Sequence, residues 1–236
     1  VIDGCPAGLP LCEEDIQKFL DRRKPGQSRY TTARKEGDLV EILSGVFEGK
    51  TTGTPISLMV RNTDQRSRDY GNIAYSYRPG HADYTFDQKY GFRDYRGGGR
   101  SSGRETIGRV AAGAIASKIL EELGISICTY TRSIGPVEIA SFNKEEIHQN
   151  AFYMPDAQAA VKAGEYLEEC MKNQDSAGGV IECRITGTPA GLGEPVFDKL
   201  SALLAHALMS IGAVKAVEIG DGIAVTSSNG STDNDG

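Results

Sequence analysis

Apolar residues recur at helical intervals most clearly near the middle of the chain. Ser102 and Glu105 precede this stretch at the spacing of a capping box, and Gly124 follows it as a C-terminal stop. The pattern predicts a helix from about residue 102 to residue 124. The residues that follow the i, i+3, i+4 spacing are Ile107, Val110, Ala111, Ala114, Ile115 and Ile119.

Three other segments predict helices. The first starts with acidic residues, ends with basic ones and stops at Pro25-Gly26, as the helix dipole and helix-breaking residues favour. The second is acidic, and the third is amphipathic. These helices are expected at residues 12–23, 155–172 and 195–211.

Runs rich in β-branched residues alternate with glycine-bearing turns between residues 39 and 62, which predicts antiparallel strands. Because strands come in pairs between helices, the pattern favours an antiparallel α+β fold over a doubly wound parallel sheet. The last ten residues, 227–236, are polar and are expected to form a mobile tail. Further strands are expected at residues 125–134, 179–187, 213–220 and 223–227.

Residues 63–103 lack long apolar periodicity but are rich in arginine, tyrosine and glycine. A stretch of this length without a core pattern is typically a functional loop or a disordered one. The sequence leaves both alternatives open.

Charge is distributed unevenly along the chain. The net charge is −6, but residues 1–120 carry +4 (19 basic, 15 acidic) and residues 121–236 carry −10 (7 basic, 17 acidic). Thirteen of the fifteen arginines lie at or before Arg109. Since the guanidinium fork matches carboxylates and phosphates, this clustering indicates an anionic small-molecule ligand, whereas the acidic half would repel nucleic acid.

The remaining composition is that of an ordinary globular protein without a membrane span, because its apolar runs are too short to cross a bilayer. Five cysteines occur without a CxxC pair or a histidine placed to complete a metal site, so no metal is expected. We expect reduced, mostly buried thiols in a cytoplasmic protein. The chain begins without Met and shows no signal peptide, which suggests a fragment.

A candidate phosphate site lies at residues 97–102, GGGRSS, directly before the central helix. Backbone N–H groups, the hydroxyls of Ser101 and Ser102 and the guanidinium of Arg100 would meet at the positive end of the helix dipole. The motif is neither a P-loop nor a dinucleotide fingerprint. A simple turn is the alternative, although the arginines at 96, 104 and 109 favour an anion.

His81 is the candidate proton-transfer residue. It lies in the sequence RPGHAD, where Pro79-Gly80 forces a tight bend, Arg78 can contact an anion and Asp83 can orient the imidazole. The alternative is a turn histidine whose hydrogen bond is satisfied by Asp83. For the other histidines, we expect a surface role for His148 and a packing role for His206.

A third basic group comprises Arg22, Arg23 and Arg29, at and beyond the end of the first helix. These arginines either complement the helix dipole or take part in binding.

Several segments carry a family resemblance, and they occur in order over nearly the entire chain. The longest is RPGHADYTFDQKYGFRDYRGGGRSSGRETIGRVAAGAIA; others are VIDGCPAGLPL, DRRKPGQSRYTTARKEGD, ILSGVFEGKTTGTPI, RNTDQRSRDY, PAGLGEPVFDKL and VKAVEIGDG. The chain resembles the chorismate synthases.

The resemblance implies a carbon–oxygen lyase acting on phosphate. Members convert 5-enolpyruvylshikimate 3-phosphate (EPSP) to chorismate and phosphate by a 1,4-anti elimination, the last common step of the shikimate pathway to the aromatic amino acids. They require reduced FMN without net redox change, and some reduce it with NADPH. The resemblance further implies a cytoplasmic homotetramer, a single core domain over residues 1–236 and a β-α-β sandwich with helices between antiparallel sheets.

Site residues carry over by position. His81 matches the histidine held to keep the reduced flavin suitably protonated. Arg100, Ser101 and Ser102 match the flavin-contacting triplet. The positions that match substrate contacts are Arg23, Arg29, Arg78, Ser102 and Arg104. We expect the arginines of the first 109 residues to surround one cavity with His81 at its wall.

The chain also departs from the family pattern. The usual GESHG-type segment and the C-terminal region with further flavin contacts are absent from the sequence, so we expect this polypeptide alone to be poorly active. Gly103 replaces a common alanine, which loosens the start of the helix. Two alternatives are kept: an RNA-binding module, since YGFRDYRGGGR interleaves aromatics and arginines, and a non-catalytic anion-binding protein.

Overall fold

The computed structural model describes residues 1–24, 26–30, 37–62, 74–96 and 99–234. By its contacts the chain divides into two compact units, which are described separately. The first comprises Val1–Arg66 and Ile107–Thr188, and the second comprises Ser67–Thr106 and Pro189–Gly236.

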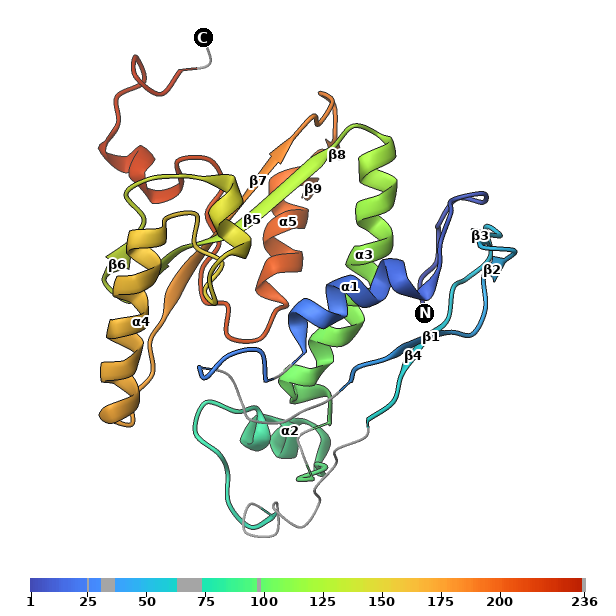
Figure 1. Cartoon of the computed structure of the whole chain (residues 1–236), viewed down its shortest axis with the longest axis horizontal. Helices are drawn as coiled ribbons and strands as arrows, with labels where there is room; N and C mark the ends of the chain where they lie inside the picture. Colours follow the sequence, from blue (N-terminus) through green and yellow to red (C-terminus); the bar gives the residue numbers. More distant parts are fainter. Residues whose placement is uncertain (25, 31–36, 63–73, 97–98, 235–236) are drawn as a thin grey trace. The chain divides into compact units, whose positions relative to one another are not determined.

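The first unit begins with helix α1 and two small antiparallel sheets (Figure 1). Helix α1 spans Glu13–Arg23, with acidic residues in its first turn and basic ones in its last. The predicted helix and antiparallel strands are therefore confirmed. The strands are β1 (Val40–Ile42), paired with β4 (Leu58–Val60), and β2 (Val46–Phe47), paired with β3 (Lys50–Thr51).

Helix α3 (Thr106–Glu122) confirms the strongest helical pattern in the sequence. Its Ala114 and Ile115 pack in one buried apolar cluster with Ile16 and Leu20 of α1. These positions are four or fewer residues apart in each helix, so each helix places one face in the core. This cluster also takes in the N-terminal segment through Leu9 and Leu11.

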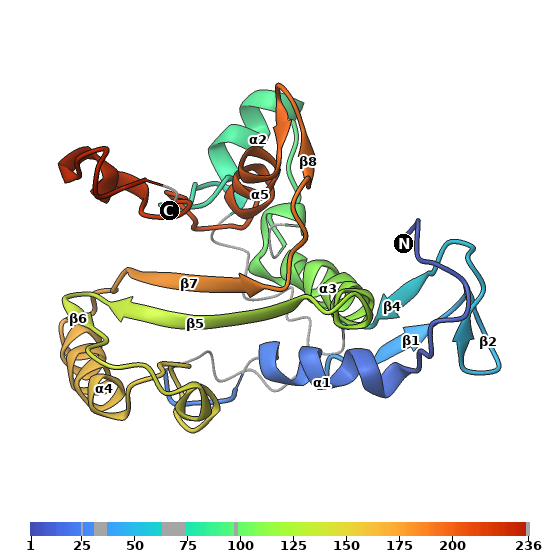
Figure 2. The same cartoon turned by 90° about the horizontal axis from the view of Figure 1, so that it is seen from above.

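A three-stranded antiparallel sheet forms the other part of the first unit. Its long strands β5 (Ser126–Ile134) and β7 (Gly179–Thr186) run side by side, with β6 (Val137–Glu138) on the far edge of β5 (Figure 2). The 3-10 segment η4 (Lys144–His148) precedes helix α4 (Ala157–Lys172), which packs by β6. These elements confirm the predicted strands and the predicted acidic helix.

The second unit contains less regular structure. Helix α2 (Asp83–Tyr90) and two 3-10 turns, η2 (Gly99–Ser101) and η3 (Gly103–Glu105), lie in its first segment. In its second segment, the hairpin of β8 (Gly193–Glu194) and β9 (Asp198–Lys199) leads into helix α5. Helix α5 (Leu200–Met209) is followed by the 3-10 segment η5 (Gly222–Ser227).

One helix was missed in this unit, and three sequence predictions need correction. Helix α2 was not predicted, because its eight residues carry no apolar stripe. Residues 195–199 are not helical, since they form the hairpin before α5. Residues 213–220 form no strand, and residues 223–227 lie in a 3-10 segment, because no neighbouring strand pairs with either run.

The α+β class with antiparallel pairing is confirmed by all strand pairs in the described residues. No helix in the described part of the chain combines the length and apolar character that a membrane crossing requires.

Candidate functional site

Residues 78–81 form the tight turn that the Pro-Gly pair predicted. The His81 N–H donates to the Arg78 carbonyl at 3.3 Å, and Gly80 has φ of +71°. Proline at the second position and a positive φ at the third are typical of a type II turn. The Nδ1 atom of His81 lies 3.2 Å from the Pro79 carbonyl oxygen. Because a carbonyl only accepts, Nδ1 carries the proton here, and Nε2 is the nitrogen left for chemistry.

Among the described residues, Asp83 makes no hydrogen bond to His81, so the predicted direct partnership is wrong. Its carboxylate accepts from Arg78 instead: Oδ2 from Nε (2.9 Å) and from the backbone N–H (3.0 Å), and Oδ1 from Nη2 (2.9 Å). A bidentate charge-assisted pair is stronger than a bond to neutral imidazole, and it takes the carboxylate. The Arg78 guanidinium holds the pKa of Asp83 well below its usual range.

Arg93 completes this network, although no pattern in the sequence singled it out. Its Nη1 lies 3.5 Å from Asp83 Oδ1, its Nε donates to Asp87 (3.1 Å), and its Nη2 donates to the carbonyls of Ala74 and Ser76. Its side chain is only 7% exposed. Arg93 lies in a segment with many arginines, and nothing in the sequence indicates that this one is buried between two carboxylates.

The segment before α3 places the phosphate motif. Ser102 Oγ accepts from the Arg104 N–H at 3.3 Å, while the Ser102 N–H donates to the Gly99 carbonyl. The carboxylate of Glu105 accepts from Arg100 at 3.0 Å and not from the Ser102 N–H, so the predicted capping box does not form and Ser102 acts as a simple N-cap. The Arg100 side chain is 85% exposed. The first two glycines of the motif lie outside the described residues.

A small pocket of about 140 Å³ opens beside this segment, within the second unit. It brings Arg100 and Ser101 of the predicted triplet next to Asp83 and Arg93 of the buried network. Sites for drug-sized ligands typically measure roughly 300–1,000 Å³. The pocket therefore has room for a group such as a phosphate rather than for a whole cofactor. Its lining residues are Asp83, Phe86, Arg93, Asp94, Gly99, Arg100 and Ser101.

The two other predicted arginines belong to the first unit. Arg23, in the last turn of α1, pairs with the buried carboxylate of Asp38 at 2.8 Å. Arg29 is 70% exposed and pairs with Glu168 of α4, and it also donates to the hydroxyl of Tyr30. Arg22, by contrast, lies over the ring of Phe19.

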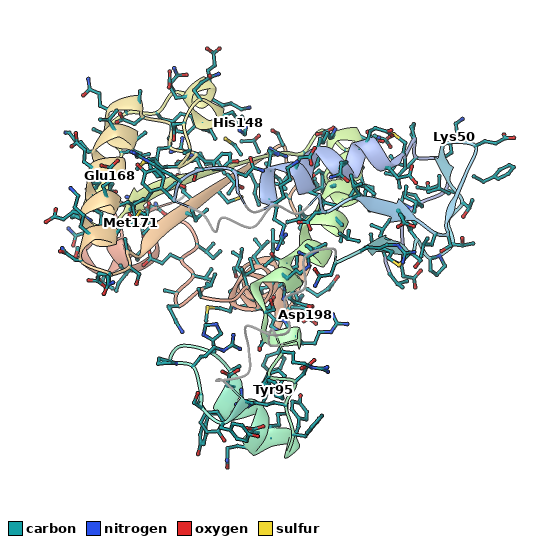
Figure 3. The ribbon with its side chains drawn as sticks, turned by 60° about the horizontal axis from the view of Figure 1, so that its bottom comes forward. Lys50, Tyr95, His148, Glu168, Met171 and Asp198 are labelled. Atoms are coloured by element: carbon teal, nitrogen blue, oxygen red, sulfur yellow. The ribbon has the colours of Figure 1, made fainter. Side chains whose placement is uncertain are left out.

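A second pocket, of about 320 Å³, adjoins Arg29 in the first unit. Tyr30, Lys172, Glu168 and Met171 line the rest of it, and the last two are marked on α4 in Figure 3. Two cations, one carboxylate and a thioether make this pocket mixed in charge.

The remaining histidines and the cysteines lie outside these pockets. His148 is exposed, as predicted, and its ring lies edge-on to Tyr153. His206 is also exposed, so its predicted packing role is wrong. All five cysteines are free, but Cys12 and Cys183 are exposed, which corrects the expectation of mostly buried thiols. Among the described residues, no cluster of histidine, cysteine and carboxylate side chains is placed to hold a metal.

The structure thus brings together part of the predicted site. Arg78 and His81 share one turn, and Arg100 and Ser101 line a pocket with Asp83, the partner of Arg78. Ser102 and Arg104 follow within three residues. Arg23 and Arg29 lie in the other unit, so a cavity shared by all the arginines stays a prediction.

Comparison with known proteins gives consistent results. The family model for chorismate synthase matches residues 1–236. A chorismate synthase of Agathobacter rectalis is 68% identical over 100% of this chain and 65% of its own length. One of Lachnoclostridium phytofermentans is 66% identical, again over 65% of its length. The chain therefore spans just under two thirds of these curated relatives.

A solved structure agrees as well. A crystal structure of chorismate synthase superposes with a TM-score of 0.81 at 34% identity, over 99% of this chain and 68% of that one. Together with the RPGHAD turn and the GRSS segment before α3, these matches establish that the chain belongs to the chorismate synthase family.

Proposed function

We propose that this chain forms part of an enzyme that eliminates phosphate from EPSP to give chorismate. The observation that carries the proposal lies in the second unit. Arg78 and His81 share one turn, and Asp83, the hydrogen-bond partner of Arg78, lines a pocket together with Arg100 and Ser101. Family membership supports a lyase and does not favour the RNA-binding or non-catalytic alternatives.

In this proposal the arginines hold the anions of the substrate. EPSP carries a phosphate and two carboxylates, and bidentate guanidinium pairs recognise such groups. Arg78 is already oriented by Asp83, and Arg23 is oriented by Asp38, so both forks are fixed before an anion arrives. The substrate contacts that we propose are Arg23, Arg29, Arg78, Ser102 and Arg104.

The flavin contacts are Arg100, Ser101 and Ser102. The pocket beside them fits a phosphate-sized group, and its arginine and hydroxyl are suitable donors to an anion. Reduced FMN, when bound, supplies electron density as the C–O bond of EPSP breaks. In this proposal Nε2 of His81 exchanges the proton, while the Pro79 carbonyl fixes the ring through Nδ1. NADPH is proposed as the source of reducing electrons.

The assembly and its location also remain proposals. Exposed apolar side chains of Ile181 on β7 and of Leu203 on α5 suit faces that a sandwich or an oligomer would cover. We propose a β-α-β sandwich within one core domain, a homotetramer and a cytoplasmic location.

A transplant tests the function. The 236 residues replace the corresponding 65% of the Agathobacter rectalis relative, and chorismate is measured anaerobically with EPSP and reduced FMN. We expect turnover by this chimera and little from the isolated 236 residues. Absence of chorismate from a folded chimera that binds neither ligand would refute the proposal.

His81→Ala in the same chimera sharpens the test. Loss of a positioned proton-transfer group lowers kcat by roughly 10²–10⁴-fold, while EPSP binding by calorimetry should be retained. His148→Ala is the matched control, because its exposed imidazole lies by Tyr153 and outside both pockets. Equal turnover in the two variants would remove His81 from the reaction.

A further inference from the structure

We propose that Asp83 is a positioning residue that fixes both Arg78 and the turn carrying His81 for the substrate. The inference rests on the proposed function and deepens it, because the family match assigns no role to this carboxylate and the direct bond to His81 that the motif suggested is not formed. Its basis is the set of contacts around Asp83 within the second unit.

Asp83 accepts hydrogen bonds from both the backbone and the side chain of Arg78. Its Oδ2 accepts from the backbone N–H of Arg78 (3.0 Å) as well as from Nε, while its Oδ1 accepts from Nη2. The carboxylate therefore holds the backbone and the guanidinium of the same residue. Asp83 binds the edge of the Arg78 guanidinium that carries Nε and Nη2. Because the group is planar and rigid, Asp83 also sets the direction of Nη1.

The same contact reaches His81 through the backbone. The Arg78 carbonyl accepts the His81 N–H, and the Arg78 N–H donates to Asp83 at the start of α2. The turn is thus closed at both ends by groups of residues 81 and 83. Because the His81 ring is bonded to Pro79 inside this turn, a displaced Arg78 backbone displaces the imidazole too.

Arg93 holds Asp83 from the other side. Its Nη1 lies 3.5 Å from Oδ1, and its Nη2 donates to the carbonyls of Ala74 (3.2 Å) and Ser76 (2.9 Å), just before the turn. Asp83 is only 4% exposed, and an ionised carboxylate is retained at such a place when cations pair with it. Asp83 stays ionised at neutral pH, so it orients its partners and transfers no proton.

The test uses Asp83→Asn and Asp83→Glu in the chimera. Asparagine removes the charge, whereas glutamate keeps it but shifts the carboxylate by one methylene. A misplacement of about 1 Å in positioned groups costs up to roughly 100-fold. We expect both variants to raise KM for EPSP, and Kd by calorimetry, about 10-fold or more.

The matched control is Asp87→Asn. Asp87 lies four residues further along α2 and accepts from Arg93 Nε at 3.1 Å, so its change weakens the network without touching the Asp83–Arg78 pair. We expect a comparable fall in the unfolding midpoint but an unchanged KM for EPSP. If Asp83→Asn does not fold, Asp83→Glu alone carries the comparison.

A double-mutant cycle supplies a second readout. Asp83 acts partly through His81. The fold-loss in kcat of the double variant, Asp83→Glu with His81→Ala, should therefore be smaller than the product of the two single fold-losses. An unchanged KM and Kd in Asp83→Glu, or equal changes in Asp87→Asn, would overturn the inference while the proposed function stands. If the parent chimera neither binds EPSP nor forms chorismate, the function itself is wrong and this inference falls with it.

Discussion

Two buried aspartates begin helices in this protein, one in each unit, and their partners differ. Asp156 precedes α4 and accepts from four backbone N–H groups, those of Ala140, Ser141, Gln158 and Ala159, at 3.0–3.1 Å. Asp83 opens α2, and besides one backbone N–H its partners are the guanidinium groups of Arg78 and Arg93. Neutral backbone donors tie a loop to a helix, whereas charged side chains held by a carboxylate are also oriented for a ligand.

The two units that contain these aspartates also differ in how many apolar residues they bury. The first unit has two clusters of buried apolar residues, one of them around Leu20, Ile56 and Ile115. Among the described residues of the second unit no apolar residue is buried, and the side chains of Asp83 and Arg93 are. Apolar burial therefore stabilises the first unit, and ion pairs organise the part of the second unit that carries the site.

The largest test of this contrast removes apolar volume from each unit. Leu20 of α1 is fully buried, and Leu20→Ala should lower the free energy of unfolding by about 2–5 kcal/mol. Leu203 of α5 is 45% exposed, so Leu203→Ala should cost less than about 1 kcal/mol. Urea unfolding measures both. Equal losses would mean that α5 is as deeply packed as α1.

Asp156 gives a smaller effect with a defined pH dependence. Asp156→Ala removes the N-cap of α4 and should cost about 1–2 kcal/mol at neutral pH. Hydrogen bonds from the backbone N–H groups of Ala159, Ala140 and Ser141 lower the pKa of Asp156 to about 2. A folded-state pKa below the unfolded value means that the contribution is complete above about pH 4 and is lost as the pH falls toward 2.

Urea midpoints from pH 7 to pH 2 measure this dependence. The variant and the parent should converge in acid. A constant gap between them would show that Asp156 does not act through its ionised form.

The smallest effect is expected at the exposed pair of Arg29 and Glu168. Both side chains are more than 40% exposed, so solvent and salt screen their attraction. Glu168→Gln should change the free energy of unfolding by about 0.5 kcal/mol or less, as measured by thermal unfolding. A loss as large as that of Asp156→Ala would show that this pair organises the first unit as the Asp83 network does the second.

Local patterns predicted the helices of the first unit because each carries its own signals. Helix α1 has charges that complement its dipole, α4 has Asp156 at its N-cap, and α3 has an apolar stripe that packs on α1. Helix α2 has charges that suit its dipole, Asp83 and Lys89, but it lacks a side-chain N-cap and an apolar stripe. Its arginine partners lie five residues before and ten residues after Asp83, at spacings that no helical period predicts.

The site shows the same division. The turn at Pro79-Gly80 and the hydroxyl cap at Ser102 follow from local backbone preferences, and both were predicted. The hydrogen-bond partner of His81 was not predicted. Pro79 and Asp83 are both two residues away in sequence, and only the folded geometry shows that the partner is the Pro79 carbonyl. A short β-rich run such as residues 223–227 likewise becomes a strand only where another strand lies beside it.

Sequence by itself determined the elements with their own caps and stripes, the concentration of arginine before residue 110 and the family to which the chain belongs. Only the tertiary structure decided which carboxylate forms an ion pair with which guanidinium. A short-range pattern sets a backbone conformation, but ion pairs are chosen by distance and burial among groups that only folding brings together.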